Sequence, residues 1–272
     1  GRAALEAGLV DELSYEDDVE RAMEQEVSLV GAGTWLRWVS WGRRLAAWGR
    51  PGEVAVVHLA GNVVLEGEGG SEVIAARDVV PVMGALAEDE DVAAVVVAVD
   101  SPGGSALASD LIWRSVAQLA SRKVVVAAYG DVAASGGVYL AAAARKVVAR
   151  PTSLTGSIGV VGGKPVLEDL ARKAGVAVQP VGDGAGMMSP FRPMTDDQRS
   201  RLATWMAETY VGFVQRVAEG RGLAIEAVEP VCRGRVWTGA QARAHGLVDE
   251  EGDLSHAIAV ARREAGLATS TV

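Results

Sequence analysis

Ser135 lies where the sequence changes from a strand pattern to a helix pattern. Val124 to Tyr129 is an unbroken apolar run rich in β-branched residues, which predicts a buried strand that ends at Gly130-Asp131. From Ala133 onward the composition is rich in Ala, Gly and Leu, which favours a helix. The first N–H groups of a helix have no internal partner and carry partial positive charge, so they can hold an oxyanion beside the serine hydroxyl. The pattern offers a nucleophile for acyl transfer, although Ser is also a common helix N-cap and could serve only as one.

A second glycine-rich turn, D-S-P-G-G-S at residues 100–105, follows another apolar stretch, Ala94 to Val99, that predicts a strand. When two parallel strands each end in such a turn, both turns lie at the same edge of the sheet, where α/β proteins bind ligands. Glycine accepts backbone angles that turn a free N–H toward a neighbouring site. We therefore expect the backbone N–H groups of Gly104 and Gly136 to act as oxyanion donors for a reaction at Ser135.

A serine nucleophile needs a base, because its hydroxyl is hardly ionised at neutral pH. The three histidines are His58 in a predicted strand, His245 at a helix end and His256 near the C-terminal end of the sequence. These positions do not favour a Ser–His–Asp triad, and the sequence around Ser135 lacks the G-x-S-x-G pattern of α/β-hydrolases.

A lysine can also act as the base when burial lowers its pKa from about 10.4 toward 7 or 8. Lys123 and Lys146 each precede a predicted strand, so we expect them at the opposite edge of the sheet from Ser135. Lys173 lies among charged neighbours on a predicted helix. Lys164 is the only lysine near a glycine-rich motif.

The composition is that of a globular protein with a sizeable core. Its 272 residues, 49% of them hydrophobic, suffice for one large α/β domain or two small ones. The chain has 35 acidic and 26 basic residues, and this acidic balance argues against a nucleic-acid-binding protein. A single cysteine, Cys232, excludes an internal disulfide, and neither a metal nor another cofactor is expected. No apolar run reaches the roughly 18 residues of a membrane span, and without a starting Met we expect a piece of a longer protein.

Alternating strand and helix patterns along the rest of the chain predict a largely parallel sheet with helical cover. The longest expected helix begins at a capping pair, Thr195 and Gln198, and stops at a Gly-Arg-Gly sequence. The expected strands are Glu53–Leu59, Lys146–Ala149 and Val176–Val181, the expected helices are Ser71–Ala87 with a bend or break near Pro81, Ala106–Ala120 and Thr195–Gly220, and a turn region covers Gly61–Gly70.

An internal repeat divides the chain. Residues 1–12 align without gaps on residues 239–250, and both copies end in G-L-V-D-E. Since the second copy ends a domain, we predict that residues 1–26 are the terminal helix of a preceding homologous repeat. Residues 27–52 are a Trp- and Arg-rich connection, and residues 53–272 form the domain with the nucleophile. The tryptophans of the connection, which suit an interface between repeats or subunits or an anionic membrane surface, are Trp35, Trp38, Trp41 and Trp48.

Four ordered motifs resemble those of the signal peptide peptidase A family, membrane-associated serine peptidases with a Ser–Lys dyad and a Clp protease/crotonase-like fold. The motifs are D-S-P-G-G-S at 100–105, G-D-V-A-A-S-G-G-V-Y at 130–139, L-T-G-S-I-G-V at 154–160 and V-W-T-G-A-Q-A-R-A-H-G-L-V-D-E at 236–250. The resemblance runs from about Glu53 to Ala265. It implies an α/β fold of repeated strand-strand-helix units.

The resemblance also implies roles for particular residues. Ser135 matches the nucleophile, and Ser157 matches the serine that hydrogen-bonds the lysine amine. The lysine of short family members falls on Ala185, shortly before an M-S-P sequence at 188–190. The base is therefore expected from the other half of the protein, as in tandem members of the family, unless Ala185 is an engineered inactivation.

The substrate implied by the resemblance is a cleaved signal peptide or a similar unfolded, apolar peptide. Extended peptides bind such sites along exposed backbone, for which Gly103, Ser105 and Gly156 are the candidate substrate-binding residues. The resemblance further implies a homo-oligomer on the extracytoplasmic (periplasmic) side of a membrane, attached through a segment outside this chain. Two alternatives stay open, a catalytically silent scaffold half and a crotonase-like acyl-CoA enzyme with the same paired N–H groups.

Overall fold

The computed structural model describes residues 2–10, 12–15, 18, 52–67, 73–179 and 186–267. The chain divides into two compact units, Gly1–Gly49 and Arg50–Val272. The first unit includes a short helix, α1 (Arg2–Glu6). Residues 27–51 of the predicted connection, with its four tryptophans, and Ala185 lie outside the described residues.

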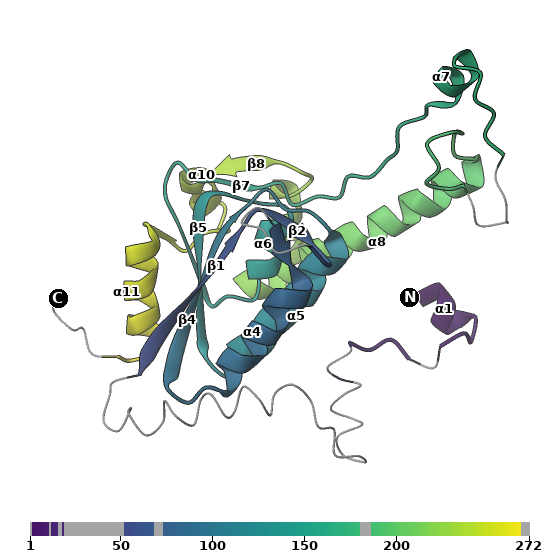
Figure 1. Ribbon diagram of the computed structural model, residues 1–272. Coiled ribbons are helices and arrows are strands. Elements are labelled where there is room, and N and C mark those ends of the chain that lie inside the picture. The colour runs from purple at the N-terminus through teal and green to yellow at the C-terminus, as the bar shows by residue number, and fades with distance from the viewer. Residues whose placement is uncertain are drawn as a thin grey trace. The chain divides into compact units, whose positions relative to one another are not determined.

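The second unit is built on a seven-stranded sheet with a parallel central path (Figure 1). The strand order along this path is β1 (Glu53–Ala60), β4 (Val92–Ser101), β5 (Val124–Ala134), β6 (Lys146–Ala149) and β9 (Glu250–Glu251). A further strand, β7 (Leu154–Gly156), pairs in parallel with the end of β5 and antiparallel with β8 (Val236–Thr238). The largely parallel sheet predicted from the sequence is confirmed.

Helices cover both faces of this sheet because successive side chains of a strand point to opposite faces. On one face Val95 and Val97 of β4 belong to a large core with α4, α5, α6 and the C-terminal half of α8. On the other face Ala94 and Val96 pack with Ala257, Val260 and Ala261 of α11. Figure 1 shows α11 on the opposite side of the sheet from α4 and α5. The helices are α4 (Ala76–Glu88), α5 (Ala106–Ala120), α6 (Gly136–Ala141), α7 (Glu168–Lys173), α8 (Asp196–Arg221), α9 (Ile225–Val228), the 3₁₀ turn η1 (Glu229–Val231), α10 (Gly239–Ala244) and α11 (Leu254–Glu264).

The strand that leads to Ser135 is longer than predicted. Gly130-Asp131 does not end it, and β5 runs on to Ala134 with α6 starting only at Gly136. Two extra residues bulge out of β5 here, since Val99 pairs with Tyr129 but Ser101 pairs with Ala133. Side chains satisfy the bulged backbone: Asp100 accepts from the N–H of Val132 at 3.1 Å, and Ser153 donates to the carbonyl of Gly130 at 2.6 Å.

Two further predictions are wrong. The expected turn region Gly61–Gly70 contains a strand, β2 (Asn62–Val64), which pairs with β3 (Val73–Ala75), so the helix expected from Ser71 starts at Ala76. These short strands form because Val63 and Ile74 are buried in the core. The strand expected at Val176–Val181 is absent over its described part, residues 176–179, where the apolar side chains are exposed and no strand pairing is formed.

The long helix α8 follows the sequence prediction closely. Thr195 and Gln198 form the predicted capping box, and Gly222 ends the helix in the left-handed conformation. Its buried residues, Phe213, Val214, Val217 and Ala218, all lie in the C-terminal half. The N-terminal half extends away from the sheet, and α7 lies near its outer end (Figure 1). Among the described residues, no helix has the length and apolarity needed to cross a membrane.

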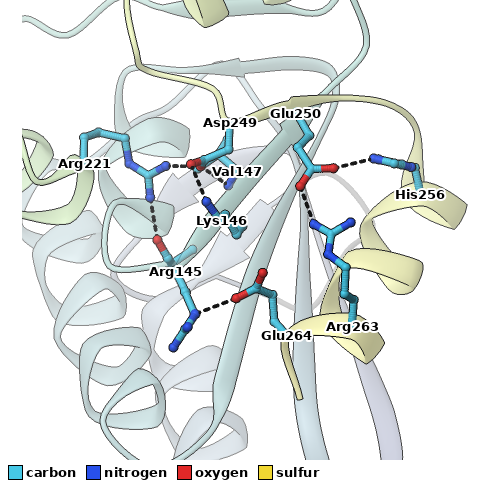
Figure 2. Close-up of polar contacts among 10 residues, drawn as sticks. Arg145, Lys146, Val147, Arg221, Asp249, Glu250, His256, Arg263 and Glu264 are labelled. Carbon is cyan, nitrogen blue, oxygen red and sulfur yellow. Dashed lines mark hydrogen bonds and ion pairs between the residues drawn. The ribbon is translucent and has the colours of Figure 1, made fainter. Parts of the chain in front are cut away.

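A polar network joins α8, β6, β9 and α11 (Figure 2). The side chain of Arg221 is 5% exposed and donates to Asp249 at 2.5 Å and to the carbonyl of Ala144. The neighbouring Glu250 accepts from His256 at 2.9 Å and from Arg263 at 2.5 Å. The network fastens the G-L-V-D-E segment of the second repeat copy to the sheet.

The two repeat copies have the same local structure. Each ends its helix at a glycine with positive φ, Gly8 at 67° and Gly246 at 74°. In each, the N–H of the following leucine bonds to the carbonyl five residues earlier, at 2.8 Å for Leu9 and 2.9 Å for Leu247. The copies differ in burial, because Leu247 is 6% exposed and Leu9 is 78% exposed.

Candidate active site

Ser135 occupies the junction between β5 and α6 in a strained backbone conformation. Its φ is 52° and its ψ is −117°, which a non-glycine residue adopts only at a cost of about 1–3 kcal/mol. The N–H of Ser135 donates to the carbonyl of Gly156 at 2.9 Å. Its side chain makes no capping hydrogen bond to α6, so the alternative of a simple helix cap has no support.

The turn after β4 is fixed on both sides of Gly104. The buried hydroxyl of Ser101 donates to the carbonyl of Gly61 at 2.6 Å and accepts from the N–H of Gly103 at 3.1 Å. Val63 of β2 donates to the carbonyl of Gly103 at 2.9 Å and accepts from the N–H of Ser105 at 2.8 Å. None of these bonds uses the N–H of Gly104. The φ of Gly104 itself is 155°.

The two glycine-rich turns touch one another, as expected from parallel strands that end at one edge. A Cβ atom on Gly103 would lie 2.7 Å from the nitrogen of Gly136 and 2.8 Å from Cβ of Ser135. A Cβ on Gly136 would lie 3.2 Å from the nitrogen of Gly104 and 2.5 Å from Oγ of Ser109. Only glycine fits at these positions, and the structure brings both candidate N–H donors next to Ser135.

Ser157 follows β7 on the other side of Ser135. It also has a positive φ, 50°, and its N–H donates to the carbonyl of Arg235 at 2.6 Å. The preceding Gly156 has a φ of 84°, and a side chain there would collide with the carbonyl of Arg235 at 2.7 Å. The two serines are thus presented by adjacent strands.

Both serines line an open cleft of about 960 Å³. Of the other predicted site residues, Gly104, Ser105 and Gly136 also line it. Gly103 and Gly156, predicted to bind substrate, are not among the described lining residues. Gly156 instead accepts a hydrogen bond from the N–H of Ser135, and Gly103 packs closely against Ser135.

Part of the cleft wall was not predicted from the sequence. It includes Arg233 after η1 and six residues of α8: Trp205, Met206, Ala207, Thr209, Tyr210 and Phe213. The sequence identified α8 as a long helix with a capped start but contains no signal for which of its residues face Ser135. Tyr139 of α6 completes this wall: its ring packs 4.7 Å from that of Phe213, and its hydroxyl donates to Asp110 at 2.7 Å.

The structure describes all four lysines of the chain, and none of them is among the described residues that line the cleft. Lys123 and Lys146 lie at the starts of β5 and β6, away from Ser135, as predicted. Lys164, the one near a motif, donates to the carbonyls of Ser189 at 2.7 Å, Arg192 at 2.8 Å and Gly186 at 3.3 Å. Its ammonium group therefore fastens one loop to another, and Lys173 is the last residue of α7.

The remaining candidate bases and nucleophiles are also accounted for. His58 lies in β1, His245 packs at a tilt against Trp237 with ring centroids 4.3 Å apart, and His256 bonds Glu250. None of them is among the cleft residues described. Cys232 is fully buried, and burial raises its pKa to about 11, so its thiol stays protonated at neutral pH.

Comparisons with known proteins agree with this architecture. Peptidase family S49 matches residues 117–268, and the Clp protease family matches residues 58–155. The structure of a ClpP1 mutant from Listeria monocytogenes superposes with a TM-score of 0.50 over 75% of this chain and 94% of that one. At 16% identity this likeness shows the fold alone, which is the predicted Clp protease/crotonase-like fold.

The sequence relatives are more specific. The chloroplastic serine protease SPPA of Arabidopsis thaliana is 32% identical over 96% of this chain, and Protease 4 of Salmonella typhi is 31% identical over 97%. The chain spans only 40% and 43% of the lengths of these two proteins. A relative from Methanocaldococcus jannaschii is 33% identical, over 85% of this chain and 76% of its own length. The chain belongs to peptidase family S49, the signal peptide peptidase A family of serine peptidases.

Proposed function

We propose that this protein is a serine endopeptidase of the Ser–Lys type, in which this chain supplies the nucleophile and the oxyanion hole and the other half supplies the lysine. One observation carries the proposal. Ser135 is held in a strained junction at a cleft, with the N–H groups of Gly104 and Gly136 beside it. Strained residues of this kind cluster at active sites.

In the proposed reaction, the neutral lysine amine removes the hydroxyl proton of Ser135 while the serine oxygen attacks the peptide carbonyl. The N–H groups of Gly104 and Gly136 bind the oxyanion that forms. The C–N bond then breaks, and the lysine ammonium gives its proton to the leaving amine. Water, deprotonated by the same lysine, hydrolyses the acyl-serine ester and restores Ser135. Ser157 accepts a hydrogen bond from the lysine and holds it in place.

Two features support a base from elsewhere in the protein. No lysine of this chain is among the described cleft residues, and Lys164 is engaged by three carbonyls. The first repeat copy ends its helix in the same way as the second, but its leucine, Leu9, is exposed whereas Leu247 is buried. This is expected if the first copy ends a preceding homologous half. The silent-scaffold alternative leaves the strained Ser135 unexplained, and membership of a peptidase family leaves the acyl-CoA alternative without support.

The proposed substrates are unfolded apolar peptides such as cleaved signal peptides. An extended peptide can run beside Gly104 and Ser105 and beside Ser157, Gly159 and Val160, while apolar residues of α8 contact its side chains. We further propose a homo-oligomer that is attached to the extracytoplasmic face of a membrane through a segment outside this chain. Exposed apolar side chains around α7, among them Leu170 and Val176, would be buried between subunits, which light scattering of a Leu170→Glu variant tests.

Labelling with a serine-directed fluorophosphonate, followed by mass spectrometry, tests the division of labour. We expect Ser135 to be labelled in the complete protein and not in this chain alone, with Ser135→Ala as the control. Efficient labelling of this chain alone would refute the need for another half. Absence of labelling in the complete, folded protein would favour the silent scaffold.

A further inference from the structure

Three non-glycine residues in the described chain have a φ in the left-handed region: Ser135, Ser157 and Arg233. All three line the same cleft. The first two are expected from their proposed roles, but nothing assigned so far explains Arg233. Because strained backbone persists where the surrounding structure enforces it, and is concentrated at binding and catalytic sites, Arg233 calls for a functional explanation.

The surrounding structure holds the Arg233 side chain firmly. Its Nε and Nη2 atoms donate to the two carboxylate oxygens of Glu229 at 2.7 and 2.8 Å. Its backbone N–H donates to the hydroxyl of Tyr210 at 3.2 Å. The hydrogen bond from Arg233 is the largest cause of the lowered pKa of the Glu229 carboxyl. Glu229 therefore stays ionised at neutral pH.

Arg233 also lies beside the segment along which substrate is proposed to bind. The N–H of the next residue, Gly234, donates to the carbonyl of Ile158 at 2.9 Å. A Cβ on Gly159 would lie 3.0 Å from Gly234. Arg233 therefore lies next to the segment that follows Ser157, and both residues line the cleft.

The chemistry of the guanidinium limits what it can bind. It has five N–H donors and no acceptor, and the contact with Glu229 uses the edge formed by Nε and Nη2. The edge formed by Nη1 and Nη2 has the geometry for a second carboxylate. Among the described residues that line the cleft, Arg233 is the only one with a charged side chain.

We propose that Arg233 is a specificity residue that binds a carboxylate of the substrate close to the scissile bond. This proposal rests on the proposed peptidase function and deepens it. The carboxylate comes either from the free C-terminus of a peptide or from an Asp or Glu side chain. In the first case the preferred substrates are fragments that an earlier peptide-bond hydrolysis has already released.

The test measures peptide binding to the complete protein with Ser135→Ala, so that no turnover occurs. Fluorescence anisotropy compares an apolar peptide that ends in a free carboxylate with the same peptide as its C-terminal amide, and an internal Asp peptide with its Asn counterpart, both amidated. We expect the carboxylate form of at least one pair to bind about tenfold more tightly, as a charge-assisted pair would allow. The pair that shows the difference identifies the source of the carboxylate.

Substitutions at Arg233 connect this preference to the guanidinium. Arg233→Gln should abolish the tenfold difference, and so should Arg233→Gly, which suits a φ of 56° and guards against misfolding. Arg243→Gln is the matched control, because Arg243 is also an exposed arginine paired with a glutamate, Glu251, but does not line the cleft. It should leave the difference intact.

Several outcomes would overturn the proposal: equal binding within both pairs, a difference that survives both Arg233 variants, or no binding of any peptide. Equal weakening of both members of each pair by Arg233→Gln would show that the guanidinium contacts the peptide backbone instead. The proposed function fails separately. If the complete protein with Ser135 intact hydrolyses none of these peptides while the Arg233-dependent difference persists, the cleft binds peptides without cleaving them.

Discussion

At Ser135, the backbone strain and the chemistry of the hydroxyl can be tested separately by substitution. A φ of 52° is costly for any residue with a Cβ atom and costs glycine little. Replacement by alanine therefore removes the hydroxyl and keeps the strain, whereas replacement by glycine removes both.

We predict that Ser135→Gly is more stable than Ser135→Ala, with a free energy of unfolding larger by about 1 kcal/mol. Its unfolding temperature should be correspondingly higher. Both variants should lose labelling and hydrolysis in the complete protein. Thermal unfolding of the two variants checks the first point. If alanine is the more stable of the two, the junction is not strained in the way described.

Gly136 offers a second test at the scale of single residues. An alanine there would bring Cβ within 2.5 Å of Oγ of Ser109 and within 3.2 Å of the nitrogen of Gly104. We predict that Gly136→Ala lowers both stability and activity, the latter by about 10²-fold or more, as for loss of an oxyanion donor.

The double variant Ser109→Ala/Gly136→Ala removes the nearer collision and retains the one beside Gly104. It should regain stability without regaining activity, while Ser109→Ala alone serves as the control for the lost hydroxyl. Recovery of full activity in the double variant would mean that the space beside Gly104 is not needed for an oxyanion.

At the scale of elements, α11 is held to β9 by ionisable groups. Burial raises the pKa of Glu250, but hydrogen bonds and charge from Arg263 and His256 together lower it below its ordinary value of 4.5. A carboxyl whose pKa is lower in the folded than in the unfolded state stabilises the fold above its unfolded pKa, and this contribution is lost as the pH falls through the folded pKa.

We therefore predict that Glu250→Gln is less stable than the unchanged chain at pH 7, and that the difference disappears as the pH falls from about 5 toward 3. Urea denaturation at a series of pH values measures it. The matched control is Glu226→Gln, a change to an exposed glutamate in α9. A difference that persists unchanged at pH 3 would show that packing of the side chain, rather than its charge, is what matters.

The elements differ in how far the sequence could predict them. Local patterns were sufficient where one element carries its own signal, as in α5 and in the capping box of α8. They failed where pairing with a distant segment decides the outcome. β5 continues past Gly130 because Asp100 in β4 and Ser153 just before β7 satisfy the bulged backbone.

The candidate site shows the same difference between local patterns and contacts with distant segments. The two glycine-rich turns could be placed together from the sequence because parallel strands end at one edge. Arg233 could not, because its position beside Ile158 and Gly159 depends on how the chain returns after α8. Nor does an Arg-Gly sequence indicate a positive φ at the arginine.

At the scale of the whole molecule, the repeat predicts what covers its first copy. In the second copy Leu247 is buried against the core of the sheet, and its aligned partner, Leu9, is 78% exposed in the structure of this chain. Identical helix ends with opposite burial are expected if Leu9 packs into a preceding half of the same fold.

We predict that Leu9→Asp strongly destabilises the complete protein and leaves this chain unaffected. Leu247→Asp should destabilise both by several kcal/mol, because it places a carboxylate in the core. The control is Leu5→Asp, since Leu5 aligns with the exposed Arg243 and should tolerate the change in either context. Urea denaturation of both proteins decides the matter. A Leu9→Asp change without effect on the complete protein would show that the first copy ends no domain, and the proposal of a lysine from a homologous half would lose its structural support.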